Sequence, residues 1–374
     1  GLEFNLHKLV SVGSTAIITT ATGVAGMLGI GYTSGMLLGF GTMNSICLGG
    51  MLAMSSTTII IKVFDELKIK EKYTELVFGT LVIQDIVGIF MMVILSTISA
   101  RQNISGVEIM GSLLLMVLYL IIWLVFGIYL LPTFFNKTIK LMNDEMLLVV
   151  SIGICFGMVL LADNLGFSTA LGAFLAGSLL AGTVHVERVE TLTKGVKDLF
   201  GAVFFISVGM MVQPEMIAKY IIPIVVIILV TLVGKLVFNS IGMLLSGQSL
   251  PNAVSSGFAL AQIGEFAFII ASFGINLGII DEYIYPIVVA VSVITTFTTP
   301  FCIKAAPIFV GWLDKVLPES AKEKLTRYTS EEQAEEEKDN DWEVFLKKYF
   351  LRMAVYGGIM LVAALVGTFK LQPF

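Results

Sequence analysis

The chain has 374 residues, of which 56% are hydrophobic and 14% are charged, with a mean hydropathy of +0.92 and a formal net charge of -5. A soluble globular protein carries roughly 25% charged residues, so this composition predicts a polytopic membrane protein whose main partner is the lipid bilayer. It excludes a soluble enzyme, a secreted disulfide scaffold and a disordered chain. The negative charge lies mostly within 319–343 and gives no indication of nucleic-acid binding.

About eleven stretches reach the roughly 20 mainly apolar residues that a helix needs to cross a bilayer. In chain order they are 9–38, 43–62, 74–97, 107–131, 145–162, 165–184, 196–213, 217–245, 250–273, 282–303 and 349–368. The sequence therefore predicts a membrane domain over 1–305, an acidic cytoplasmic linker over 306–348 and an additional transmembrane helix over 349–374. Most Lys and Arg residues fall in alternate connections, which predicts a cytoplasmic start.

The first three spans resemble the spans at 217–245, 250–273 and 282–303 in their lengths and in their polar interruptions. The first span of the second triplet comes seven crossings after the first span of the first triplet, an odd number, so the two triplets would cross the membrane in opposite directions. This pattern predicts an all-α membrane protein with an inverted repeat, which is the architecture of secondary transporters.

A polar cluster interrupts the middle span of each triplet. A broken helix in hydrocarbon must line a protein-enclosed cavity, where its half-helix ends offer dipoles and carbonyl oxygens to an ion. Alternatively, the hydroxyl groups bond only to their own helix. The polar residues concerned are Ser55, Ser56 and Thr57 in the first cluster and Gln262, Gly264 and Glu265 in the second.

Asp85 lies at the centre of the uncharged stretch 78–98. An ionised group at that depth costs roughly 2.5–3.5 kcal/mol, although a neutral carboxyl in a helix contact is an alternative. Burial favours the protonated form and a bound cation favours the ionised form, so a proton and a cation would compete for this group. The neighbouring Gln84 is expected to belong to the same ion-binding site but cannot titrate, and we therefore expect one proton to be exchanged for one cation.

Lys235 is the only base deep within a span. We expect it to pair with Asp85, because unpaired burial is costly for both charges, and the alternative is that it snorkels to an interface. Glu265 would either line the ion path or lock the second break by accepting backbone N–H bonds.

Several segments, in the same order along the chain, resemble monovalent cation:proton antiporters of the Kef type. They are 1–4 (GLEF), 55–57 (SST), 82–86 (VIQDI), 171–177 (LGAFLAG), 204–210 (FFISVGM) and 262–268 (QIGEFAF). The resemblance implies two inverted repeats, two crossed discontinuous helices, a homodimer and no cofactor. It also implies that the chain begins after the family's first two or three helices.

In that family the cation and the proton exchange at the aspartate matching Asp85, beside the Ser-Ser-Thr break and the lysine matching Lys235. Kef systems carry a soluble nucleotide-binding domain after the membrane domain. Here an acidic stretch and an apolar one follow instead, and a regulatory region could lie beyond Phe374.

The expected function is exchange of a monovalent cation, K⁺ in the first place, for H⁺ in a bacterial inner membrane. A Na⁺/H⁺ antiporter of the same fold is the alternative, and a cation channel is the alternative from another class. A channel would need a filter of carbonyls or carboxylate rings, and an intramembrane protease would need a second catalytic group near Asp85. The sequence shows neither pattern, so we expect a transporter and not an enzyme.

Overall fold

The computed structural model describes residues 6–99, 142–164, 169–181, 186–210 and 214–318, together with a few isolated positions between them. All the secondary structure in these ranges is helical, which confirms the expected all-α fold. The spans expected at 107–131 and 349–368 lie outside the described residues.

Four helices cover the first three expected spans. They are α1 (Leu6–Leu37), α2 (Thr42–Ala53), α3 (Thr57–Leu67) and α4 (Lys72–Ser99). The turn between α1 and α2 contains Gly39 and Gly41, with φ angles of 78° and 79°. Only glycine adopts this left-handed conformation without a steric cost, so the chain reverses tightly here.

The central part of the chain forms α6 (Asp144–Asn164), α7 (Thr169–Ala181), α8 (Val186–Met210) and the short α9 (Pro214–Lys219). α8 begins well before the expected start at 196. The expectation was based on apolar length and therefore left out the first turns of the helix, which are polar. Arg188 of α8 forms an ion pair with Asp144 in the first turn of α6. This pair joins the two helices at one end.

The last described elements are α10 (Ile221–Leu245), α11 (Leu250–Ala259), α12 (Glu265–Asn276) and α13 (Ile284–Val316). α13 continues past the expected end at 303 and contains Pro300 and Pro307 within the helix. The first residues of the expected linker are therefore helical.

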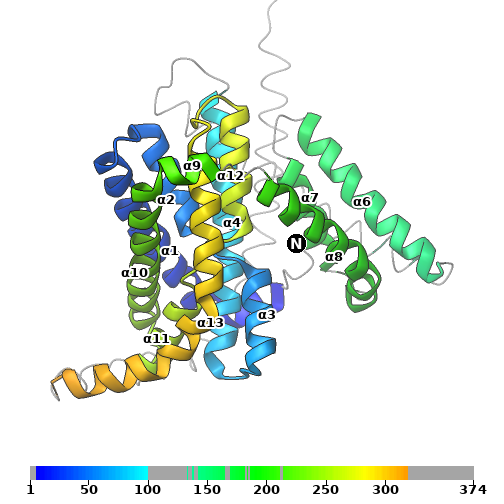
Figure 1. Ribbon diagram of the computed structural model, residues 1–374. Helices are drawn as coiled ribbons and strands as arrows, with labels where there is room; N and C mark the ends of the chain where they lie inside the picture. Colours follow the sequence, from blue (N-terminus) through cyan, green and yellow to red (C-terminus); the bar gives the residue numbers. More distant parts are fainter. Residues whose placement is uncertain are drawn as a thin grey trace, which may run out of the picture.

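Helices α1 to α4 and α10 to α13 form one bundle, with α6, α7 and α8 beside it (Figure 1). α2 and α12 lie toward one end of the bundle, and α3 and α11 lie toward the other. The two interrupted helices thus run in opposite directions. An inverted repeat requires this course, but the repeat itself stays a prediction.

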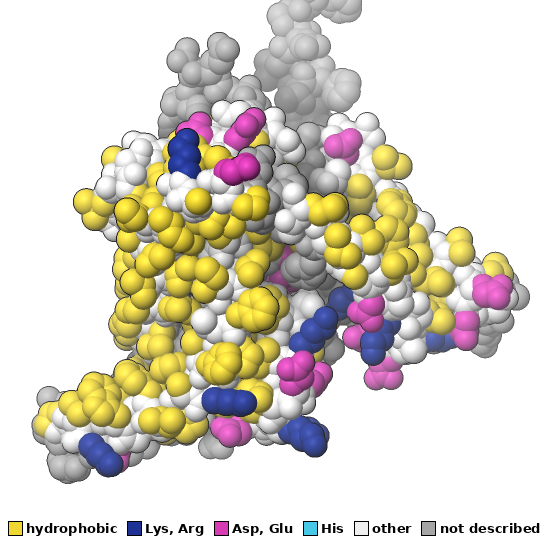
Figure 2. Space-filling model, in the orientation of Figure 1, with side chains coloured by type: hydrophobic (Ala, Val, Ile, Leu, Met, Phe, Trp, Pro, Cys, Tyr) yellow, Lys and Arg dark blue, Asp and Glu magenta, His cyan; other side chains and the backbone are white. Residues whose placement is uncertain are grey.

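The surface agrees with a protein set in a bilayer. Six described helices are long and apolar enough to cross a membrane. Hydrophobic side chains cover the flank of the bundle in Figure 2, whereas Lys, Arg, Asp and Glu gather toward its two ends. An apolar flank of this kind is suited to contact with the hydrocarbon of a lipid bilayer.

α1 and α10 pack closely and in antiparallel directions. A Cβ on Gly26 would meet the ring of Phe238, and a Cβ on Gly234 would lie 2.9 Å from the sulfur of Met27. Small residues allow helix backbones to approach in a membrane, where no hydrophobic effect drives association. The close packing leaves Lys235, next to Gly234, completely buried.

Candidate cation site at the crossing of two interrupted helices

The first interruption separates α2 from α3 at residues 54–56. Met54 and Ser56 both have extended backbone, with ψ angles of 130° and 119°. The Ser56 hydroxyl accepts a hydrogen bond from the Ile59 N–H at 3.2 Å, so Ser56 caps the N-terminus of α3. Such a cap satisfies one of the N–H groups that a helix start leaves unpaired.

The second interruption separates α11 from α12 and ends at Gly264, whose backbone is also extended. The Gly264 N–H donates to the Met54 carbonyl at 3.0 Å, and the Ser55 hydroxyl donates to the Leu260 carbonyl at 3.2 Å. A Cβ at Gly264 would lie 2.5 Å from the carbonyl carbon of Ser55. The two interrupted segments therefore touch, which confirms the expected crossing of two discontinuous helices.

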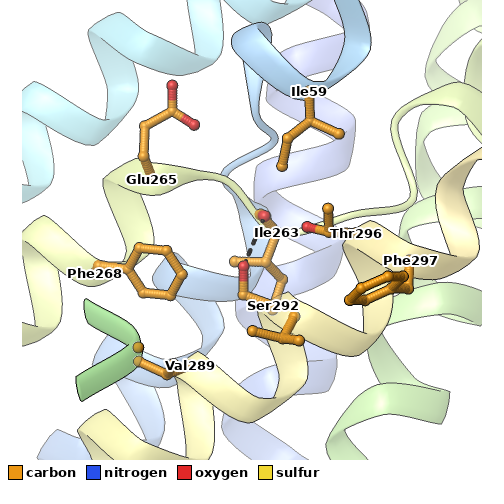
Figure 3. A pocket seen from close by; sticks show the side chains of 10 residues that line it. Ile59, Ile263, Glu265, Phe268, Val289, Ser292, Thr296 and Phe297 are labelled. Atoms are coloured by element: carbon orange, nitrogen blue, oxygen red, sulfur yellow. Dashed lines mark hydrogen bonds between the residues drawn. The ribbon is translucent and has the colours of Figure 1, made fainter. Parts of the chain in front are cut away.

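Neighbouring helices hold both interruptions in place. On α4, the side-chain oxygen of Gln84 accepts from the Ser55 N–H at 3.1 Å. On α13, the hydroxyl of Thr295 accepts from the Ile263 N–H at 3.3 Å, and the Ser292 hydroxyl donates to the Ile263 carbonyl at 3.1 Å (Figure 3). Each break is thus held by the third helix of its own triplet.

The roles of Ser292 and Thr295 were not anticipated from the sequence. The available signal was a run of hydroxyl residues in an otherwise apolar span, at Ser292, Thr295, Thr296, Thr298 and Thr299. Gln84 was expected to contact the ion, and the structure uses its amide oxygen to hold the first break.

Lys235 binds the crossing through main-chain carbonyl groups. Its ammonium nitrogen donates to the carbonyls of Ala53 at 3.3 Å, Met54 at 3.0 Å and Gln262 at 2.7 Å. An ammonium group has three N–H donors, and these bonds use all of them. These bonds to main-chain carbonyls were not anticipated from the sequence, and the expected pairing of Lys235 with Asp85 stays a prediction.

Lys235 finds these acceptors because a helix end leaves unpaired carbonyls with partial negative charge. Ala53 is the last residue of α2, and Gln262 lies just beyond the end of α11. The breaks therefore supply both the acceptors and the counter-charge that an isolated lysine needs. An interpretation based on side-chain charges alone overlooks them.

Glu265 is the first residue of α12 and is half-buried. One carboxylate oxygen accepts from the Thr58 hydroxyl of α3 at 3.4 Å. A carboxylate near the starts of two helices is favoured by the partial positive charge there. Its other oxygen, Oε2, is buried without a hydrogen-bond partner among the described residues.

The crossing has more oxygen acceptors than the described donors satisfy. Thr57 Oγ1 and Gln262 Oε1 share the situation of Glu265 Oε2: each is buried and none has a partner within the described part of the chain. Gln262 is held there by its amide nitrogen, which donates to the Ser56 carbonyl at 3.3 Å. Spare hydroxyl, amide and carboxylate oxygens are suitable ligands for a hard cation.

Asp85 follows Gln84 on α4 and is half-buried, whereas the Gln84 side chain is 1% exposed. The bond from Ser55 to Gln84 brings this turn of α4 against the first break. Asp85 therefore belongs to the turn of α4 that lies against the first break, and its role as the exchanging carboxyl group stays a prediction.

A pocket of about 260 Å³ lies beside the second break, and its described lining is mainly apolar. The carboxylate of Glu265 points away from Ser292 and Thr296 in this view (Figure 3). Asp85 is not among the described lining residues. The pocket therefore reaches the candidate site at Glu265, whereas Lys235, Thr57 and Gln262 lie outside its described lining.

The model of the family described as "Sodium/hydrogen exchanger, transmembrane" matches residues 1–306. This chain belongs to the sodium/hydrogen exchanger family. The match confirms the resemblance to monovalent cation:proton antiporters. The family and the fold are those of transporters, whose substrates are the cation and the proton and which need no cofactor.

Two curated relatives of this exchanger-family chain differ in the ion that they name. This chain is 26% identical over 312 residues to K(+) efflux antiporter 5 of Arabidopsis thaliana, and the match covers 82% of this chain and 55% of that protein. It is 30% identical over 308 residues to the iron transporter MagA of Paramagnetospirillum magneticum, covering 80% of this chain and 69% of that protein. The chain thus spans about half the length of the plant relative.

A solved structure shows the same fold. The sodium proton antiporter MjNhaP1 from Methanocaldococcus jannaschii superposes with a TM-score of 0.61 at 16% sequence identity, over 83% of this chain and 80% of that one. The exchanger fold is therefore established for this chain, and its specific cation is a separate question.

Proposed function

We propose that this chain exchanges a monovalent cation, K⁺ in the first place, for a proton, and that Asp85 binds each in turn. Na⁺ is the second candidate. The name of the plant relative supports K⁺, and that of the archaeal sodium proton antiporter supports Na⁺. The relatives named above are antiporters or transporters, and none of them is named as a cation channel.

The arrangement of ionisable side chains at the crossing is the observation that carries the proposal. Lys235 lies on the negative ends of two half-helices, and Glu265 lies near the positive ends of the other two. When Lys235 is protonated and both Glu265 and Asp85 are ionised, the three side chains carry one net negative charge. One proton or one monovalent cation neutralises the site, and burial makes neutrality favourable.

The kinds of ligand present in the described residues also favour a monovalent ion over iron as the transported ion. In the part of the chain that the structure describes, no group of three or more His, Cys, Asp or Glu residues could hold a metal ion. A transition metal usually requires such donors. A partly dehydrated alkali cation instead requires several oxygens, which Thr57, Gln262 and Glu265 offer at the crossing.

Stoichiometry follows from the same groups. Gln84 is an amide that cannot take up a proton, and Lys235 uses its three N–H donors on carbonyls, which favours the charged ammonium. We therefore infer that Asp85 alone alternates between proton and cation. The exchange would be one-for-one and electroneutral.

The resemblance to the Kef type adds three further parts to the proposal. The chain would act as a homodimer in a bacterial inner membrane, and a regulatory region could lie beyond Phe374. The plant relative indicates that related proteins also occur outside bacteria. Cross-linking of the protein in native membranes tests the dimer: a cross-linked species of twice the monomer mass is expected, and its absence contradicts it.

Reconstituted flux tests the main proposal. Proteoliposomes loaded with a pH-sensitive dye receive K⁺ or Na⁺ outside, and we expect release of protons that is faster for K⁺. Asp85→Asn keeps the size of the side chain but cannot ionise, so it should abolish the response. More than a few per cent of the unsubstituted rate in Asp85→Asn would overturn the assignment, and equal rates for Na⁺ would overturn only the K⁺ preference.

A further inference from the structure

The last part of α13 leaves the bundle and runs across its end. This turn away from the bundle follows Pro300 and Pro307, which interrupt the helical hydrogen-bond pattern and allow bending. The segment after the bend lies at the end where α3 and α11 are found (Figure 1). The membrane-exchange site uses none of its side chains.

One stripe of this segment is apolar and open. Phe301, Ile308, Trp312 and Val316 are 73%, 76%, 53% and 58% exposed. The last three residues recur at intervals of four, which places them on one side of a helix with 3.6 residues per turn. The residues on the side facing the protein are buried, as Ile303 and Ala306 show.

Contacts with the bundle fix the rotation of the segment. The ring of Phe309 packs against Phe258 of α11 with ring centroids 5.4 Å apart, and it stacks on Trp312 at 5.3 Å. The Trp312 ring is thereby supported on one side while the rest of it stays exposed. The apolar stripe is therefore held outward by packing.

Charged side chains flank the stripe. Lys304 and Lys315 are exposed and lie, by helical rotation, at one edge of it, whereas Asp314 lies on the far side. In Figure 2 the hydrophobic side chains of this segment continue toward the apolar flank of the bundle, and Lys and Asp or Glu side chains lie on the side away from it.

We propose that residues 301–316 form an interfacial anchor that lies in the plane of the bilayer surface. The apolar stripe enters the boundary between headgroups and acyl chains, and Lys304 and Lys315 contact anionic headgroups. Three observations support lipid as the occupant: the stripe continues the apolar belt of the bundle, a tryptophan lies at its centre, and lysines border it. This combination is typical of helices that bind at membrane interfaces.

Such an anchor has a consequence for the exchange site. Earlier in the same helix, Ser292 and Thr295 hold Ile263 of the second break. A fixed depth for the end of α13 therefore fixes the depth of the helix that supports the crossing. Anionic lipid would act on the exchanger through this helix.

Fluorescence of the full chain in vesicles tests the proposal. The sequence has three tryptophans, at 123, 312 and 342, so Trp123→Phe with Trp342→Phe leaves Trp312 as the probe. In phosphatidylcholine vesicles brominated near the top of the acyl chains, Trp312 emission should be blue-shifted and quenched about twofold or more. Aqueous iodide should quench it little.

A matched control moves the indole to the charged side. In the same background, Trp312→Phe combined with Asp314→Trp should show red-shifted emission that iodide quenches and brominated lipid does not. Each variant must keep the melting temperature of the unsubstituted protein. If the single-tryptophan chain does not fold, the difference in emission between the unsubstituted protein and Trp312→Phe measures the same environment.

The outcomes separate lipid from other occupants. Quenching of Trp312 by iodide would overturn the anchor, and a blue-shifted emission that neither agent quenches would mean that protein, such as a second copy, covers the stripe. In mixed vesicles, brominated phosphatidylglycerol should quench Trp312 more than brominated phosphatidylcholine does. Lys304→Gln with Lys315→Gln should remove that preference, and an unchanged preference would overturn the role of the two lysines.

Discussion

Lys235 is a fully buried lysine whose side-chain nitrogen donates to three carbonyl groups, so its contribution to stability is specific and measurable. Lys235→Met keeps the length of the side chain but leaves the carbonyls of Ala53, Met54 and Gln262 without this donor. Each unsatisfied buried group costs about 1–3 kcal/mol. We expect a clearly lower melting temperature in detergent.

Asp85→Asn is the control for that measurement, because it removes the carboxylate of Asp85 and leaves the three carbonyl contacts of Lys235 in place. The asparagine variant should melt close to the unsubstituted protein while losing exchange. Equal melting of Lys235→Met and the unsubstituted protein would show that the carbonyl contacts contribute little.

Ser56 and Thr57 are neighbours with different surroundings, and they allow a matched test. The Ser56 hydroxyl is used as a helix cap, whereas Thr57 Oγ1 is buried without a partner in the described region. Thr57→Val should raise the half-saturating cation concentration about tenfold, because a ligand contribution of about 1.4 kcal/mol corresponds to that factor. The maximal rate and the melting temperature should change little.

Ser56→Ala should behave in the opposite way. Loss of an N-cap costs about 1 kcal/mol of stability, so the melting temperature falls while cation affinity stays. Stopped-flow flux at several cation concentrations and thermal unfolding give both quantities. If Thr57→Val lowered stability and left affinity unchanged, the Thr57 hydroxyl would have a structural role.

At the scale of the elements, the crossing depends on close approach of two backbones at Gly264. A methyl group there would lie 2.5 Å from Ser55 and 2.6 Å from the Ser56 nitrogen, and both contacts are to main-chain atoms. Backbone cannot move aside as a side chain can. Gly264→Ala should therefore destabilise the fold by about 1–3 kcal/mol, as overpacking does, and should impair exchange through a displaced break.

Gly29 of α1 provides the matched glycine. A Cβ at Gly29 would meet nothing within 4 Å, and alanine is the better helix former. Gly29→Ala should therefore melt at or above the temperature of the unsubstituted protein and keep its exchange rate. Similar losses in both variants would indicate general helix sensitivity instead of contact between the breaks.

For the whole molecule, a single exchanging carboxyl group predicts both charge balance and pH dependence. If proton and cation compete for Asp85, the half-saturating cation concentration rises about tenfold for each pH unit below the pH at which the site is half-protonated. Exchange therefore weakens as pH falls. This dependence is measured as flux against cation concentration at several pH values.

Electrical recording on a solid-supported membrane tests the stoichiometry. An electroneutral exchanger gives no sustained current during a cation jump, because one positive charge enters as another leaves. A current that scales with turnover and is absent in Asp85→Asn would overturn the one-for-one exchange. Lys235 would then be the first residue to consider as the carrier of a second proton.

Much of the fold could be predicted from the sequence. Apolar length places α1, α4, α6 and α10 because transfer of apolar side chains to lipid depends on local composition. The polar clusters at 54–58 and 261–265 marked both breaks, since polar groups in an apolar span need a special environment. Asp85 is a candidate exchange residue for the same reason.

Other features were decided only by the tertiary structure. The partners of Lys235 are carbonyl groups, which every residue carries, so no side-chain pattern distinguishes the three that the breaks leave available. The support of Ile263 by Ser292 and Thr295 and the bend of α13 after its prolines depend in the same way on which elements pack together. Partition between lipid and water acts on each segment by itself and can be inferred from the sequence, whereas hydrogen bonding depends on atoms that only folding brings within reach.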